Sequence, residues 1–463
     1  MAQAPAKFLT GSLFKHVSVM SLTASIGLMA VFLVDFIDMI FISMLGKAEL
    51  AAAIGYAGAI LFFTTSFSIG LAIAAGALVA RALGAGDDGL AARRTSTSLI
   101  YGVIFSAVFA ALVWLNLRFF AELLGATGET LELTVHYLQI IVPSLPLLMI
   151  GMMGGAILRA HGDAKRAMMA TIYGGAVNAI LDPILIFGLD LELTGAALAS
   201  VCARFAIAGT ALIPIIKYYG GLKWPTFGCL IEDLPPTMTI AVPAILTQLA
   251  TPVGQAYVTR AMADYGEAAV AGMAIVGRLT PVAFGVVFAL SGAIGPIIGQ
   301  NYGAKDHARV LGAFRAGLLF SGIVVVSITI ILFALRQPIA TLFDAEGITR
   351  DLIFLFCGPL ALLFFFNGAL FVANAAFNNL GHPFYSTWIN WGRHTLGTMP
   401  MVALFAWGFG AQGVLIGQAV AGVVFGSLAL WLAIRVMRSE TEAVAAEPFA
   451  RQARLFSLLH LRR

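Results

Sequence analysis

The segment "FLVDFIDMIFISMLG" (residues 32–46) is strongly apolar, yet it contains two carboxylates, Asp35 and Asp38. About 20 consecutive apolar residues in a helix are enough to cross a lipid bilayer, so the surrounding sequence predicts a transmembrane helix. A carboxylate near the bilayer centre costs about 3 kcal/mol and therefore faces the protein interior or water. Residues three positions apart on a helix lie about 60° apart, so both carboxylates share one face. The segment predicts a helix whose acidic face turns toward the inside of a membrane bundle.

The composition of the whole chain agrees with a membrane protein. The chain has 463 residues, of which 60% are hydrophobic and 11% are charged, and its mean hydropathy is +0.94. A soluble domain carries about 25% charged residues. The first apolar run is too long for a signal peptide, so we interpret it as a retained first span. The net charge of +4 is too small to indicate a nucleic-acid partner.

Motifs for enzymatic chemistry are absent from the sequence. The three cysteines, Cys202, Cys229 and Cys357, have no motif spacing and are interpreted as packing residues. We find no Walker A loop, no Cys/His metal cluster and no nucleophile elbow. The sequence therefore predicts that the protein is not an enzyme, and that it has neither a metal site nor a cofactor other than a coupling ion.

Twelve apolar segments are long enough to span a bilayer, and helices are expected because backbone groups in lipid must be satisfied within each segment. The predicted spans are 15–45, 52–82, 96–118, 134–158, 167–188, 195–216, 236–263, 268–300, 309–334, 351–379, 384–408 and 413–436. If the N-terminus is cytoplasmic, the cytoplasmic segments hold 19 of the 27 Lys and Arg residues and the opposite loops hold four. This bias predicts a multi-pass protein of the plasma (inner) membrane with both termini in the cytoplasm.

The two halves of the chain repeat. Gly84 in "LGAGDDGLAARR" and Gly303 in "YGAKDHARVLGA" lie 219 residues apart, and so do Gly162 and Gly381. Six spans per half is an even number, so the halves are parallel repeats. We expect an all-α membrane fold with an N-terminal lobe at 1–216, a cytoplasmic linker at 217–235, a C-terminal lobe at 236–436 and a cytoplasmic tail at 437–463.

Away from the span ends, three acids lie within predicted spans, and all three are in the first half: Asp35, Asp38 and Asp182. Asn178 and Asp182 in "NAILDP" are at positions i and i+4 and share a helix face, and Pro183 can open the helix beside them. Carboxylate and amide oxygens at a helix break make a candidate site for H⁺ or Na⁺. An architectural pair with Arg204 is the structural alternative for Asp38 and Asp182, and Asp35 is either a second proton carrier or a hydrated bystander.

Several segments together resemble the multidrug and toxic compound extrusion (MATE) family. These are "DMIFISMLGKAELAA" (38–52), "GALVARALGAGDD" (76–88), "GPIIGQNYGAKDH" (295–307), "LRAHGDAKRAMM" (158–169), "NAILDPILIFGL" (178–189) and "TGAALAS" (194–200). The resemblance implies twelve helices in two six-helix lobes around a V-shaped cleft. It also implies cation-coupled export of organic compounds, with a coupling cluster in the N-terminal lobe.

The resemblance assigns the coupling cluster to particular residues. The first-span aspartate falls on Asp38, the fifth-span pair falls on Asn178 and Asp182, and a hydroxyl falls on Ser200, while Asp35 stands where Asn is more usual. The chain departs from this branch of the family in two ways: Val34 replaces a common Tyr, and the proline expected early in the first span is missing. The stretches "ILTQLATPVGQAYV" (245–258) in span 7 and "FFFNGALFVANAAF" (364–377) in span 10 contain no acid, which disfavours a sodium site in the second half.

We expect a monomeric antiporter in membrane lipid that exports small organic, cationic or amphipathic molecules in exchange for H⁺ or Na⁺. The substrate-binding residues are not identified by the sequence. A lipid-linked precursor flippase or a dedicated metabolite exporter is the alternative, because Arg204, Arg260, Arg278 and Arg393 lie within spans and could bind a phosphate, although packing roles are favoured for them. A passive channel or a membrane scaffold is a second alternative. The restriction of the intramembrane acids to the first half of the chain argues against it.

Overall fold

The computed structural model describes residues 6–45, 47–220 and 222–460, without the side chains of Asp35, Met39, Ser43, Ala48 and residues 440–460. Within this part the chain is helical and its elements are connected by short turns. Nine helices are long and apolar enough to cross a membrane, and two bent helix pairs each make a further span.

The N-lobe contains the first six spans. Its elements are α1 (Leu13–Met44), α2 (Ala48–Gly84), α3 (Asp88–Leu115), α4 (Leu117–Leu123), α5 (Gly128–Ile141), η2 (Val142–Ser144), α6 (Leu145–Ala160), α7 (Ala164–Pro183), η3 (Ile184–Gly188) and α8 (Glu192–Tyr218). Aspartates cap the starts of two helices, since the Asp87 side chain accepts from Leu90 N and the Asp163 side chain accepts from Arg166 N.

The C-lobe contains the remaining spans. Its elements are α9 (Phe227–Ala263), α10 (Glu267–Ala283), α11 (Gly285–Gly303), α12 (His307–Leu342), α13 (Gly347–Leu355), η4 (Phe356–Leu360), α14 (Ala361–Leu363), α15 (Phe365–Asn379), α16 (Pro383–Gly392), η5 (Arg393–Gly397) and α17 (Thr398–His460). The pair α10–α11 bends by 49° and the pair formed by Gly347–Leu363 and Phe365–Asn379 bends by 43°.

The stretch from Pro383 to Ser439 contains two spans. As one straight helix its 57 residues would be about 85 Å long, far more than a bilayer requires. Gly410 breaks the helix with φ of 58°. A Cβ at Gly413 would lie 2.0 Å from the Phe405 carbonyl oxygen, and one at Gly417 would lie 2.6 Å from the Met401 carbonyl oxygen. The segment after Gly410 therefore packs antiparallel on the segment before it, and the described chain has twelve spans as predicted.

Two helices extend into the linker range predicted at 217–235. Helix α8 continues to Tyr218, and α9 already begins at Phe227, where the Thr226 side chain accepts a hydrogen bond from Cys229 N and caps the helix. The prolines at 235 and 236, which suggested a loop, lie inside α9.

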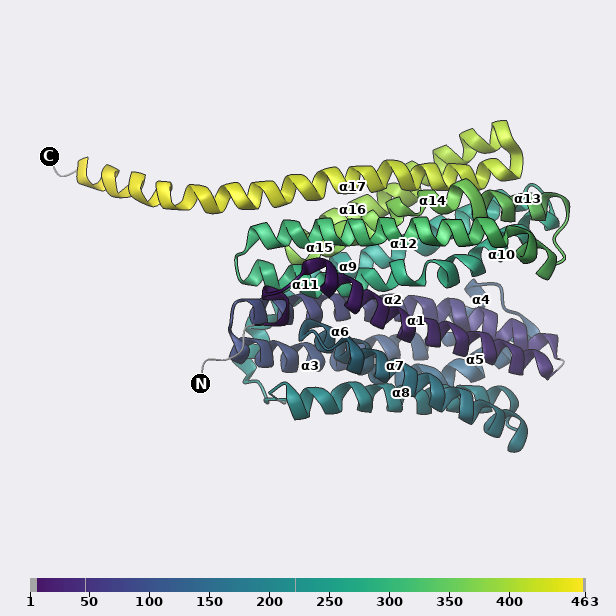
Figure 1. The fold of residues 1–463 in the computed structure, drawn as a ribbon. Coiled ribbons are helices and arrows are strands. Elements are labelled where there is room, and N and C mark those ends of the chain that lie inside the picture. The colour runs from purple at the N-terminus through teal and green to yellow at the C-terminus, as the bar shows by residue number, and fades with distance from the viewer. Residues whose placement is uncertain (1–5, 46, 221, 461–463) are drawn as a thin grey trace.

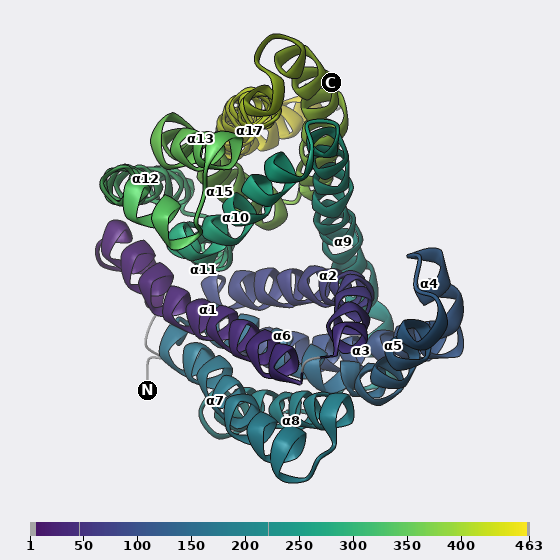
Figure 2. The same cartoon turned by 90° about the vertical axis from the view of Figure 1, so that its right-hand side faces the viewer.

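The two lobes meet where α2 crosses α11 (Figures 1 and 2). A Cβ at Gly84 would lie 1.9 Å from the Gln300 carbonyl oxygen, and a Cβ at Gly303 would lie 2.1 Å from the Arg81 carbonyl oxygen. Arg81 and Gln300 are 219 residues apart, as are Gly84 and Gly303, so each repeat makes the same contact on the other. The glycines that indicated the repeat are therefore the point of closest approach between the lobes.

A short N-terminal segment, η1 (Lys7–Leu9), bridges the lobes at this same end. Lys7 Nζ donates to the Gly162 carbonyl oxygen in the N-lobe at 2.6 Å, whereas Phe8 N donates to Gln300 Oε1 in the C-lobe at 2.9 Å. Arg309 Nη2 also donates to the Phe8 carbonyl oxygen at 2.9 Å. These contacts join the lobes at one end of the bundle, the end near which both termini lie (Figure 1).

Candidate functional site

The Asp38, Asn178 and Asp182 side chains form one hydrogen-bonded cluster inside the N-lobe. Asn178 Nδ2 donates to Asp38 Oδ1 at 3.2 Å and to Asp182 Oδ2 at 2.6 Å. Asn178 and Asp182 are buried, with 5% and 1% of their surface exposed. The structure therefore places Asp38 of α1 beside Asn178 and Asp182 of α7.

The two carboxyl groups of this cluster also lie within hydrogen-bonding reach of each other. Two ionised carboxylates in contact repel, whereas a proton on one of them allows it to donate to the other. Asp182 Oδ1 is buried and accepts no hydrogen bond from an amide or hydroxyl donor in the described chain. The arrangement is suited to a pair of carboxyls that holds one proton between them.

Small residues bring α1 and α7 close enough for this contact. A Cβ at Gly27 would lie 2.5 Å from Thr171 Oγ1, and one at Gly175 would lie 3.0 Å from Val34 Cγ2. Below the cluster, Pro183 ends α7, and the chain continues as a π-helical turn, η3. The chain thus changes from α- to π-helical hydrogen bonding directly after Pro183, and π-helical turns are frequent at functional sites.

Two hydroxyl groups lie near the acids. Tyr137 on α5 is buried, and its hydroxyl is within hydrogen-bonding reach of Ser200 on α8 and close to the charges of Asp38 and Asp182. Ser200 was identified from the sequence, but Tyr137 was not, because a tyrosine in an amphipathic segment carries no signal of its own. Asp35 lies on α1, and its side chain is outside the described part of the structure.

Arg204 does not pair with the acids, contrary to the structural alternative considered from the sequence. Its Nη1 donates to the Ile141 carbonyl oxygen at 2.9 Å and to Ser144 Oγ at 2.8 Å. These acceptors lie where α5 passes through η2 into α6. Arg204 therefore stabilises this junction, and the carboxyl pair has no described cationic partner within an ion-pair distance.

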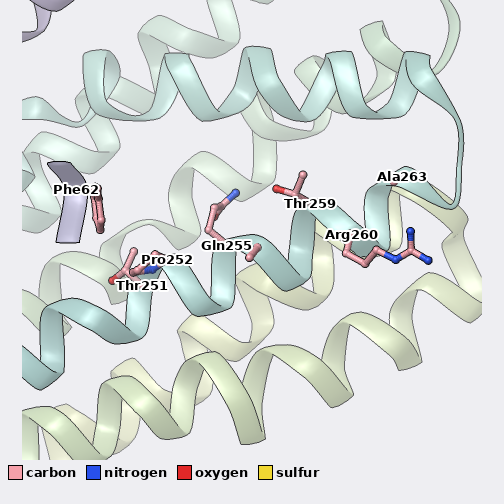
Figure 3. A pocket seen from close by; sticks show the side chains of 8 residues that line it. Phe62, Thr251, Pro252, Gln255, Thr259, Arg260 and Ala263 are labelled. Carbon is pink, nitrogen blue, oxygen red and sulfur yellow. The ribbon is translucent and has the colours of Figure 1, made fainter. Parts of the chain in front are cut away.

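A cavity of about 700 Å³ opens between the lobes (Figure 3). Phe62 on α2 forms its N-lobe wall, and α9 provides the C-lobe wall with the residues Thr251, Pro252, Gln255, Ala256, Thr259, Arg260 and Ala263. The lining combines apolar surface with a few polar groups, as is usual for sites that bind small organic molecules. This cavity is the candidate substrate site, which the sequence left open.

The MatE family model matches residues 24–184 and 243–424, well over half of the chain. The chain belongs to the MATE family. It is 30% identical over 431 residues to the FAD transporter of Shewanella oneidensis, covering 90% of this chain and 93% of that protein. It is 27% identical over 339 residues to the multidrug export protein MepA of Staphylococcus aureus, covering 72% of this chain and 74% of MepA.

A solved MATE structure has the same fold. A crystal structure of a mutant of the Vibrio cholerae MATE transporter VcmN superposes with a TM-score of 0.88 at 25% sequence identity, covering 92% of this chain and 97% of VcmN. This MATE chain is therefore a multi-pass membrane transporter that exports small molecules, and not an enzyme, as the sequence predicted.

Proposed function

We propose that this MATE transporter exports organic amphipathic compounds in exchange for protons, and that the Asp38–Asp182 pair carries the proton. The observation that supports this most directly is the contact between the two carboxyl groups around the Asn178 amide. A carboxyl pair that gains and loses one proton has two charge states, and each state favours a different packing of the surrounding helices.

The proposed cycle uses these two charge states. Protonation of the pair from outside removes a negative charge from the N-lobe and favours release of the substrate from the cleft. Deprotonation toward the cytoplasm restores the charge and allows the next substrate to bind. The apolar wall at Phe62 and the polar groups of α9 suit an amphipathic molecule.

The orientation of Asn178 supports a proton rather than Na⁺. Its NH₂ group faces both carboxyls, and a donor in that position repels a cation that would need oxygen ligands. Na⁺ coupling at the same cluster is the alternative, and it would require Asn178 to turn its oxygen toward the ion.

Transport in proteoliposomes tests the coupling. We expect ethidium transport driven by a proton gradient, with no drive from a Na⁺ gradient alone. Asp38→Asn should abolish this transport while the protein remains folded in the membrane, whereas Asp264→Asn, which alters an exposed acid in a loop, should have no effect. Transport by Asp38→Asn at the wild-type rate would exclude Asp38 as the proton carrier, and transport driven only by Na⁺ would exclude proton coupling.

A second candidate function is the export of phosphate-bearing metabolites. It is supported by the similarity over nearly the whole chain to a protein named as an FAD transporter. Of the four arginines within spans, Arg204 is engaged in the N-lobe, but Arg260 lines the cleft and Arg393 lies inside the C-lobe. A lipid-linked precursor flippase would use the same groups.

We also propose that the transporter acts as a monomer in the plasma membrane with both termini in the cytoplasm. The distribution of Lys and Arg between the loops supports this orientation. Labelling of single cysteines introduced in the loops of intact cells would test it, and labelling of the 302–306 loop from outside would contradict it.

A further inference from the structure

The interior of the C-lobe contains an arginine without a described counter-charge. The Arg393 Nε is buried and has no hydrogen-bond partner, and no ion pair of the described residues includes Arg393. The described acids of this lobe lie in loops or near helix ends. A cation inside a membrane bundle costs free energy unless it is paired, so such residues often mark a binding site for an anion.

The position of Arg393 fits a substrate site. Ten residues of α16 precede it, which corresponds to about 15 Å along the span, or about half the thickness of the hydrocarbon core. Transporters generally bind substrates near this depth. Arg393 also begins η5, a π-helical turn that interrupts the span, and such turns are frequent at functional sites.

The internal repeat relates Arg393 to the acidic cluster of the N-lobe. The 219-residue offset matches Asn178 with Gly397, so Arg393 lies four residues, about one turn, before the position equivalent to Asn178. Equivalent helices in the two lobes therefore carry opposite charges near the same depth. The positive charge of Arg393 attracts an anionic group in the cleft toward the C-lobe.

Two amide side chains lie on the route from Arg393 to the cleft. A Cβ at Gly422 would lie 3.6 Å from Arg393 Nη2 and 4.0 Å from Asn367 Nδ2, so both groups approach the same glycine. One turn earlier on α17, Gln418 Nε2 donates to Gln255 Oε1 at 3.3 Å, and Gln255 lines the cleft (Figure 3). The donors thus form a series that starts at the cleft and ends at Arg393.

We propose that Arg393, with Asn367 and Gln418 as neutral donors, binds the phosphate of an organic phosphate that this transporter exports. The inference rests on the proposed export function and specifies the substrate class of the same cleft. A guanidinium group matches two phosphate oxygens at once. The aromatic or apolar part of the substrate then lies in the cleft against Phe62, with the phosphate directed into the C-lobe.

Flavin binding to the purified full-length transporter tests this proposal, with FAD as the phosphate-bearing probe and riboflavin as its phosphate-free counterpart. Quenching of flavin fluorescence gives both affinities. Arg393→Gln should weaken FAD binding roughly 10- to 100-fold, the range for a lost charge-assisted hydrogen bond, and leave riboflavin binding unchanged. Arg393→Lys should retain part of the FAD affinity because it keeps the charge.

Arg336→Gln is the matched control, because it removes a C-lobe arginine whose guanidinium lies over Phe333 rather than in η5. Equal weakening of FAD and riboflavin by Arg393→Gln, or weakening of FAD by Arg336→Gln to the same extent, would overturn the proposal. Inorganic pyrophosphate is a second probe that should raise the Tm of the wild type and not that of Arg393→Gln. If neither FAD nor pyrophosphate binds the wild type, the proposal is wrong.

The same variants separate this proposal from the proposed proton coupling. Loss of ethidium transport in Asp38→Asn tests the proton coupling, whereas the change in the ratio of FAD to riboflavin affinity in Arg393→Gln tests the phosphate site. If Asp38→Asn transports normally, proton coupling through Asp38 fails, and the phosphate site is still judged by the flavin measurements.

Discussion

Alanine at Gly84 or Gly303 tests whether the crossing of α2 and α11 holds the lobes together in the described conformation. The added Cβ would lie 1.9 Å from the Gln300 carbonyl oxygen at one site and 2.1 Å from the Arg81 carbonyl oxygen at the other. Carbon and oxygen normally approach to about 3.3 Å, so the helices must separate by more than about 1 Å. Both obstructing atoms belong to backbones, which cannot move aside as a flexible side chain could.

The magnitude follows from the bonds that span this crossing. Arg81 Nη2 donates to the Asn378 carbonyl oxygen at 2.7 Å, and Gln300 Nε2 donates to the Ala160 carbonyl oxygen at 2.7 Å. A separation of about 1 Å would stretch both beyond hydrogen-bonding distance, with a loss of about 1 kcal/mol each. Overpacking adds about 1–3 kcal/mol. We expect each substitution to destabilise the described conformation by about 3 kcal/mol or more.

Thermal melting and hydrogen–deuterium exchange of the purified transporter measure this effect. Both variants should melt at a lower temperature and exchange faster around residues 76–90 and 295–310. The double variant should show less than the sum of the two effects, because one separation relieves both clashes. Gly58→Ala on α2 is the control, since a Cβ there has no neighbour within 4 Å and alanine favours the helix by up to about 1 kcal/mol.

Two results would refute the reasoning. If Gly84→Ala melts and exchanges like Gly58→Ala, the crossing does not hold the lobes together. If only one of Gly84→Ala and Gly303→Ala destabilises the protein, the two repeats do not make equivalent contacts.

Three further predictions concern other contacts. Burial lowers the pKa of His161, in the loop after α6, to about 4. Between about pH 6.5 and pH 4 the unfolded chain therefore binds a proton that the folded loop excludes, so the free energy of unfolding should fall as the pH drops through this range. Melts of His161→Gln across the same range should show a weaker pH dependence. Gly254→Ala places a Cβ 2.0 Å from the His394 Nδ1 and should lower the Tm, whereas adding His394→Ala should restore part of it; no restoration would contradict the contact. Arg93 on α3 donates two hydrogen bonds to the Asp233 carboxylate on α9, with nitrogen–oxygen distances of 2.8 and 3.0 Å. Asp233→Asn weakens this ion pair and should reduce the free energy of unfolding by about 2 kcal/mol. An unchanged melting temperature would contradict this role.

The fold follows from local patterns that the sequence displays directly. Apolar segments of sufficient length predicted the twelve spans, and the break at Gly410 accounts for two spans inside one continuous helical stretch. The repeated glycines at 84 and 303 predicted two equivalent halves, and they lie at the contact between those halves. The sequence did not predict that α9 begins at Phe227, because the prolines at 235 and 236 suggested a loop, whereas the Thr226 cap starts a helix that continues through them.

The sequence by itself determined which residues are too polar for lipid, because a charge inside an apolar span must face protein or water wherever the helix packs. It thereby identified Asp38 and Asp182, and Asn178 by its spacing. Only the tertiary structure decided which groups meet, because contacts between different helices depend on helix rotation and on close approach at glycines. That packing joined Asp38 to Asn178 and Asp182, directed Arg204 to the Ile141 carbonyl and the Ser144 hydroxyl, and left Arg393 Nε without a described hydrogen-bond partner.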